Sequence, residues 1–532
     1  MINIFYKNNK LVFIILFFIL FIFVDQNFTK KNSSILSWDE VDYANSASLG
    51  VLENSFEFKS LNFYQFINLG LFKLSNINSK VSKLESVDIL NNLETDIFNL
   101  RHFHPPLYSY YLSMFIFDQD NLINAKNLRA AHKYLGYLYP LFLLLSFYFI
   151  NKNTNMSLLK YLLIFVLSLI FFYSKLFQDN LLNLNYHTLF AICLLLYSYT
   201  LYKYLIKGTF KNLIRFSFST SIILISLETA IVIIIPCLLF IFLQILKYKK
   251  SFYNFKYIVI FIFLFFIIFW PANIYNFSIL KSYLMYIYRI FINENIEYSE
   301  LNNIIFFKNI FFNNIEIFII FFFYLFIFFL FFKNYKINHL LFFLNALIYF
   351  IFIINFSHHT NYLIPSFILF SFFVILIVSN NKLPILNNKI IKNTSLLFFF
   401  IFLLKNIYYN VPTSIIENND LQEIKLINNY IKNNSDENEI IIADGAHIFN
   451  YYQNTYQYIN LSLFDKYNPK FYVKVDNIFY DTEFLLQKKL ISFLIINKIR
   501  NYKLDQYEFL ISNGYEKKEF PNYYIFKKVN NS

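Results

Sequence analysis

The chain has 532 residues, of which 57% are hydrophobic and 15% are charged, and its formal net charge is +13. A soluble protein carries about 25% charged residues, so this composition excludes an ordinary soluble enzyme. The basic residues lie mainly in short loops between apolar runs, a pattern typical of membrane proteins, which argues against a nucleic-acid partner. Both cysteines, Cys193 and Cys237, lie inside apolar runs, so we expect neither a disulfide framework nor a CxxC site.

The apolar runs approach the length that a helix needs to cross a bilayer. The first run follows Lys7 and Lys10 and lacks the small-x-small site that follows a signal peptide, so we expect an uncleaved helix there. About eleven spans are predicted in all, at 11–24, 129–150, 158–176, 185–203, 214–230, 231–247, 257–276, 316–332, 339–356, 361–379 and 394–409.

Lysine and arginine are distributed unevenly between the loops. If the N-terminus is cytoplasmic, the short cytoplasmic loops hold most of them, and the short outer loops hold only Lys175, Lys281, Arg289 and Lys308. This asymmetry supports an integral membrane protein with a cytoplasmic N-terminus. Two large segments then lie outside, namely the first loop at 25–128 and the tail at 411–532.

The two outer segments differ in pattern. The first loop contains amphipathic stretches at 61–74 and 105–117, which are too short to span and are expected to lie at the membrane interface. The tail mixes polar residues with short apolar runs, and predicts a helix at 421–432 and strands at 439–443, 490–496 and 523–528. The predicted fold is an all-α polytopic membrane domain at 1–410 followed by a small outer α/β domain at 411–532.

Unusual polar residues converge on the outer side of this topology, although none of them was used to place the spans. The convergence predicts a polar cavity at the outer leaflet. These residues are Asp39, Glu40, Asp42, His102, His104, Asp179, Glu228, Arg289, His358 and His359.

Asp39 and Glu40 form an acidic pair in Ser-Trp-Asp-Glu-Val-Asp-Tyr, shortly after the first span. One interpretation is a catalytic carboxylate at the membrane surface. The other is a solvated loop or a helix N-terminus, where acids suit the helix dipole. Glu228, between two apolar runs, also has two interpretations. An acid at that place marks either a functional site or a tight outer turn.

The loop Arg-His-Phe-His-Pro-Pro-Leu-Tyr places His102 and His104 before Pro105 and Tyr108. Proline restricts the residue before it, so this loop predicts a rigid, extended entry to an interfacial helix. Histidine can donate a hydrogen bond to a phosphate or a carboxylate near neutral pH. The alternative is ordinary anchoring of the loop at the interface.

An Asp-Glu pair after the first span, followed about sixty-five residues later by His-Pro-Pro-Leu-Tyr, resembles the GT-C glycosyltransferases. The resemblance covers about 1–410 and is strongest to the protein O-mannosyltransferases and the lipid A aminoarabinose transferases. It implies that Asp39 is catalytic, that Glu40 supports it, and that the loop from His102 to Tyr108 shapes the site. Asp179 stands where relatives carry a second acid. Asn361 stands where relatives carry the arginine of an Arg-Tyr-Leu-x-Pro pattern.

The resemblance also implies a substrate class. The donor would be a sugar linked to a polyprenyl phosphate in the bilayer, and the acceptor would be lipid A, another glycan, a glycolipid or a protein. Asp39 would act as the general base, and cations would stabilise the departing phosphate. The candidates that face the substrates are Arg129, Arg289, Lys175, His358 and His359, each of which is alternatively an interfacial residue. No cofactor and no metal are expected, although oligosaccharyltransferases of the same class use a divalent cation.

Two other functions compete with the enzyme. A transporter or lipid flippase predicts charged or broken helices near mid-membrane and inverted repeats, and the chain shows no visible repeat and has 6 glycines. A polytopic assembly or receptor protein would not explain the acids and histidines that cluster in the first loop.

The topology makes a direct prediction. Reporter fusions at Glu40 and Asp420 should both report the outer side of the membrane, because an odd number of spans separates the cytoplasmic N-terminus from the tail. A cytoplasmic signal from either fusion would contradict the assignment of both large segments to one face.

Overall fold

The computed structural model describes the chain mainly over 105–115, 125–151, 174–182, 184–247, 253–275, 315–330, 336–356, 360–379, 419–435, 439–444, 458–463, 471–475, 478–481, 483–498 and 504–529. Shorter described stretches and single residues are 14–15, 18, 40, 43–44, 47, 81–83, 160–161, 163–165, 167, 172, 280, 283–284, 287 and 449.

Apolar helices build the larger part of the molecule, because lipid offers no partner to a backbone N–H or C=O and a helix satisfies both internally. In chain order they are α7 (Leu107–Ser113), α8 (Ala125–Asn151), α10 (Lys175–Leu182), α11 (His187–Ile206), α12 (Phe210–Leu224), α13 (Ala230–Lys247), α14 (Tyr253–Phe269), α15 (Ala272–Tyr275), α18 (Ile315–Leu330), α19 (Ile337–Phe356), the 3-10 helix η3 (Thr360–Leu363) and α20 (Ile364–Ser379).

Five helices within the described residues are long and apolar enough to cross a membrane. They lie on α8, α11, α13, α19 and the stretch formed by η3 and α20, and each coincides with a predicted span. Helices α12, α14 and α18 occupy three further predicted spans. The predicted spans at 11–24, 158–176 and 394–409 lie partly or wholly outside the described residues, so the total number of spans stays a prediction.

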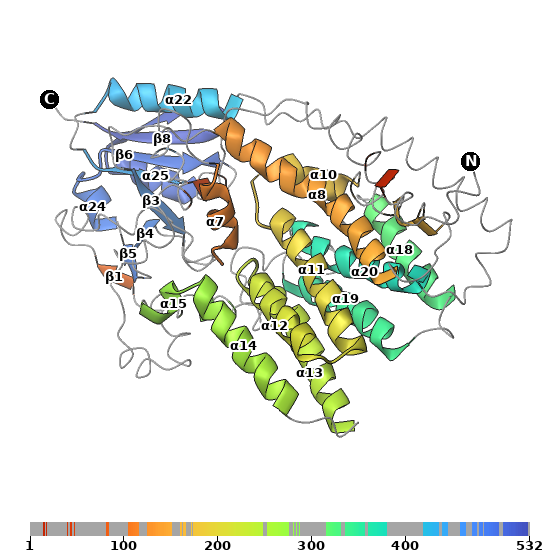
Figure 1. The fold of residues 1–532 in the computed structure, drawn as a ribbon. Helices are drawn as coiled ribbons and strands as arrows, with labels where there is room; N and C mark the ends of the chain where they lie inside the picture. Colours follow the sequence, from red (N-terminus) through yellow and green to blue (C-terminus); the bar gives the residue numbers. More distant parts are fainter. Residues whose placement is uncertain are drawn as a thin grey trace.

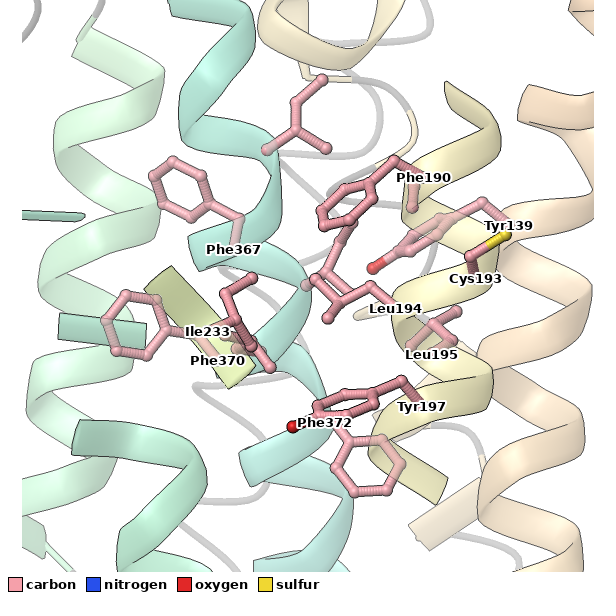
Figure 2. Packing of buried hydrophobic residues seen from close by; sticks show 14 of the residues in the cluster. Tyr139, Phe190, Cys193, Leu194, Leu195, Tyr197, Ile233, Phe367, Phe370 and Phe372 are labelled. Carbon is pink, nitrogen blue, oxygen red and sulfur yellow. The ribbon is translucent and has the colours of Figure 1, made fainter. Parts of the chain in front are cut away.

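Helix α20 is the centre of the membrane part. Every residue from Ile364 to Val378 is buried, as expected for a helix that is apolar all round and surrounded by other helices. Figure 2 shows Phe372 of α20 beside Tyr197 of α11, within one continuous core. This packing holds α8, α11, α19 and α20 together and so fixes where their ends lie.

The tail folds around a mixed sheet, as predicted. The sheet order is β1-β5-β4-β3-β2-β6-β8-β7. Its strands are β1 (Val81–Lys83), β2 (Ile441–Ala443), β3 (Tyr458–Leu463), β4 (Phe471–Val475), β5 (Ile478–Asp481), β6 (Phe493–Asn497), β7 (Tyr515–Glu519) and β8 (Tyr523–Lys528), and its helices are α22 (Asn419–Lys432), α24 (Glu483–Gln487) and α25 (Leu504–Ser512). The mainly α-helical membrane fold with a small α/β tail is confirmed.

Strand β1 was not expected in this sheet, because it comes from the first outer loop. It pairs with β5 in parallel, with Val81 opposite Phe479 and Lys83 opposite Asp481. The first loop and the tail therefore share one sheet, which lies at the end of the helix bundle nearest α7 and α15 (Figure 1). Residues on either side of β1 belong to the loop that carries the predicted site.

Helix α10 lies against α8 at a glycine. A Cβ added to Gly136 of α8 would lie 1.9 Å from Cδ2 of Leu181 on α10 and 3.3 Å from Cγ2 of Thr188 on α11. Small residues allow helices to approach closely in membranes. Gly136 therefore sets the separation between α8 and α10.

We expect Gly136→Leu to push α10 away from α8 and to lower the Tm of the detergent-purified protein, since overpacking a tight contact costs about 1–3 kcal/mol. Gly208→Leu is the matched control, because the nearest atom to its added Cβ is 4.0 Å away. Equal Tm values for the two variants would contradict the close packing of α8 and α10.

Candidate functional site

Glu40 lies in a helical segment that buries one face. Glu40, Tyr43, Ala44 and Ala47 are all helical and all buried, and their spacing of three and four residues places them on one side of a helix. Glu40 therefore does not lie in a solvated loop. Asp39 itself lies outside the described residues.

A buried ion pair holds Glu40 in place. Nη2 of Arg129, on α8, donates to Oε2 of Glu40 at 2.5 Å, and the two side chains are 6% and 3% exposed. The backbone N–H of Leu184 donates to Oε1 at 2.8 Å. A buried carboxylate is stable only when it is paired and hydrogen-bonded, and here each oxygen has a partner. Glu40 thus ties the first loop to α8 and to the segment between α10 and α11.

Tyr108 and His132 form a second connection beside this pair. Nε2 of His132 lies 2.7 Å from the backbone oxygen of Asn180, which can only accept, so Nε2 carries the proton. Nδ1 then accepts from the hydroxyl of Tyr108 at 2.9 Å. Burial raises the pKa of Tyr108 well above its ordinary value, and the nearby Tyr43 and Glu40 add to the rise. The hydroxyl therefore stays protonated and available as a donor.

Aromatic rings close the space between these groups. The Tyr43 ring meets the Tyr108 ring edge to face at 5.1 Å and the Tyr186 ring at 5.8 Å. The hydroxyl of Tyr186 lies 2.8 Å from that of Tyr362 on η3. The site is therefore bounded by the Glu40 segment, α7, the segment before α11, and η3.

Asn180 joins α10 to η3. Its Nδ2 donates to Oδ1 of Asn361 at 3.2 Å, and its backbone oxygen accepts from Nδ2 of Asn185 at 2.8 Å. Oδ1 of Asn180 is buried and has no hydrogen-bond partner in the part of the chain that the structure describes. Asn361, which stands where relatives carry arginine, therefore belongs to this same cluster.

The structure brings three predicted site residues together, namely Glu40, Tyr108 and Arg129. Pro105 is buried just before α7 begins, and the backbone of Asp179 lies on α10, next to Asn180. The predicted residues Asp39, His102, His104, Arg289, His358 and His359 lie outside the described residues. The side chains of Asp179 and Lys175 lie outside them too.

Sequence reasoning missed His132, Asn180 and Tyr43. His132 follows Arg129 by three residues, so a polar face at the start of α8 was a visible signal. Within the described residues, no group of three His, Cys, Asp or Glu side chains is placed to hold a metal ion. The expectation of a metal-free site stays a prediction, because several acids and histidines of the first loop lie outside those residues.

Comparison with known proteins supports the fold through structure alone. No family model and no curated protein sequence matches this chain. The crystal structure of ArnT from Cupriavidus metallidurans, bound to undecaprenyl phosphate, matches 98% of this chain and 98% of its own, with a TM-score of 0.55 and 8% sequence identity. The chain therefore shares the fold of this ArnT structure, which confirms the fold that the resemblance to the GT-C glycosyltransferases predicted.

The Glu40–Arg129 pair makes a stability prediction. Glu40→Gln should lower the Tm of the purified protein by an amount equivalent to about 3–5 kcal/mol, because it leaves the Arg129 charge buried and unpaired. The double variant Glu40→Gln, Arg129→Met should recover part of this loss. Glu519→Gln is the matched control, since it breaks an exposed pair with Lys498 and should barely change the Tm. Equal effects of Glu40→Gln and Glu519→Gln would show that the buried pair has no structural role.

Proposed function

We propose that this protein is a membrane glycosyltransferase, which moves a sugar from a polyprenyl phosphate to an acceptor hydroxyl, with Asp39 as general base. The observation that carries the proposal is the buried Glu40–Arg129 pair, next in the chain to Asp39. It occurs in a fold shared along the whole chain with an ArnT whose structure contains undecaprenyl phosphate. The acceptor is lipid A, another glycan, a glycolipid or a protein at the outer face of the bacterial inner membrane.

The two members of the acidic pair take different roles in this proposal. Both oxygens of Glu40 already accept hydrogen bonds, from Arg129 and from the backbone of Leu184. A carboxylate engaged in this way is a poor proton acceptor for a substrate. Glu40 is therefore a positioning residue, and its covalent neighbour Asp39 is the base.

The reaction follows from these roles. Asp39 takes the proton from the acceptor hydroxyl as its oxygen attacks the anomeric carbon of the donor sugar. The new C–O bond forms from one side while the bond to the phosphate breaks on the other, so the configuration inverts. The bonding electrons leave on the lipid phosphate, whose growing negative charge calls for cations nearby.

Arg129 is the one candidate cation whose side chain is among the described residues. It is 5% exposed, and its Nη2 is engaged by Glu40. Its Nε is buried and has no hydrogen-bond partner in the described part of the chain, so this donor remains available for an oxygen of the donor phosphate. Arg289, Lys175 and His358 are the further candidates.

Asp39→Asn tests the proposal. A general base contributes a factor of about 10²–10⁴ in rate, so we expect the variant to insert and accumulate normally while sugar transfer falls at least about 100-fold. Transfer is measured by mass spectrometry of the surface glycans of cells that carry the wild type, the variant or neither. Glu40→Gln serves as the contrast, because loss of the buried pair should lower both the Tm and the transfer, whereas Asp39→Asn should lower transfer alone. Full transfer by Asp39→Asn would rule out Asp39 as the base.

A further inference from the structure

The carboxamide of Asn273 is buried, and no described residue forms a hydrogen bond with it. Asn273 lies on α15, three residues after Trp270, and is 4% exposed. Neither its Nδ2 nor its Oδ1 has a hydrogen-bond partner in the part of the chain that the structure describes. Native proteins rarely leave a buried amide unpaired, because its lost hydration is not repaid. Such a group calls for a bound molecule that supplies both a donor and an acceptor.

An aromatic cluster lies beside Asn273, apart from the main core. This outer aromatic cluster consists of Ile225, Trp270, Ala272, Tyr283 and Ile287. The rings of Trp270 and Tyr283 meet edge to face at 5.2 Å. Apolar and aromatic walls with a few fixed polar groups are the usual composition of a small-molecule site.

Glu228 adds a buried acid to the same region. It lies in the turn between α12 and α13, three residues after Ile225 of the outer aromatic cluster, and is 0% exposed. Glu228 is thus both buried and in a tight turn, so the two interpretations of the sequence, a functional acid and a tight turn, do not exclude each other. The carboxyl oxygens of Glu228 can accept a hydrogen bond from a neutral hydroxyl.

Helix α7 joins this region to the Glu40 site. Leu107 packs against the outer aromatic cluster, and its N–H donates to the backbone oxygen of Ile225 at 3.0 Å. The next residue, Tyr108, contacts the Glu40 site through His132. Successive residues of a helix point about 100° apart around a cylinder about 10 Å across. Leu107 and Tyr108 therefore place the two regions on different faces of the start of α7.

We propose that the carboxamide of Asn273 and the carboxylate of Glu228, beside the outer aromatic cluster, form a subsite for a neutral sugar ring. The amide donates to one hydroxyl and accepts from its neighbour, and Glu228 accepts from a third. The phosphate stays on the Arg129 side of α7. This inference rests on the proposed function and deepens it, since it assigns residues that select the sugar of the donor or of the acceptor.

Asn273→Leu tests the subsite, because leucine has a similar volume and no polar atom. The ligands are undecaprenyl phosphate, undecaprenyl phosphates carrying a hexose or a pentose, and methyl glycosides, each titrated by thermal shift against the full-length protein in detergent. We expect the variant to bind bare undecaprenyl phosphate as the wild type does and to lose about tenfold or more in affinity for the sugar. A loss with the lipid-linked sugars identifies the donor, and a loss with the methyl glycosides alone identifies the acceptor.

Asn345→Leu is the matched control. Asn345 is also buried, but its Nδ2 donates to the backbone oxygen of Ile233 at 2.9 Å and to Sγ of Cys237 at 3.0 Å. Its replacement should lower the Tm and leave sugar affinity unchanged, whereas Asn273→Leu should not lower the Tm of the ligand-free protein.

Wild-type sugar affinity in Asn273→Leu would mean that the amide holds only water, and would overturn the subsite. The absence of any sugar-dependent stabilisation of the wild type would overturn it too. If bare undecaprenyl phosphate stabilises neither protein, the proposed function fails instead, and the methyl glycosides still decide whether the subsite exists.

Discussion

The arrangement of the site depends on the buried ion pair between Glu40 and Arg129. An isolated buried charge is expensive, so each of these residues requires the other, and the backbone of Leu184 completes the arrangement. The pair joins a loop, a membrane helix and an inter-helix segment that are far apart in sequence. With Glu40 held in this way, the backbone constrains the position of Asp39. The proposed role of Asp39 as general base requires such a fixed position relative to the substrate.

The bilayer imposes the complementary constraint. Apolar helices such as α20 cannot carry unpaired polar groups toward lipid, so chemistry is confined to the helix ends and to the elements that cap them. The hydrogen bonds among Tyr108, His132, Asn180 and Asn361 all lie at the end of the bundle that α7 covers. A polar network there serves two purposes, since it satisfies the helix ends and supplies donors and acceptors for a ligand.

Sequence patterns predicted some features well because their physical signals are local. Long apolar runs identified α11 and α20, and the terminal strand β8 coincides with the prediction at 523–528. Glu40 and Arg129 were each singled out, yet their pairing across 89 positions was not, because no local pattern records it. His132 was not singled out, because its partners Tyr108 and Asn180 are distant in sequence, and the three residues of β1 are too few to show an alternation. What was missed depends on contacts between distant segments.

Strand β1 pairs with a strand that is synthesised much later than β1 itself. Its partner β5 follows much later in the chain, because Val81 pairs with Phe479, 398 positions further on. The first loop therefore cannot reach its final pairing until the intervening helices have been made, and pairing across such a distance is slow relative to the formation of the local helices. A chain interrupted before the tail would leave β1 without its partner and expose an unpaired strand edge, which can pair with another chain.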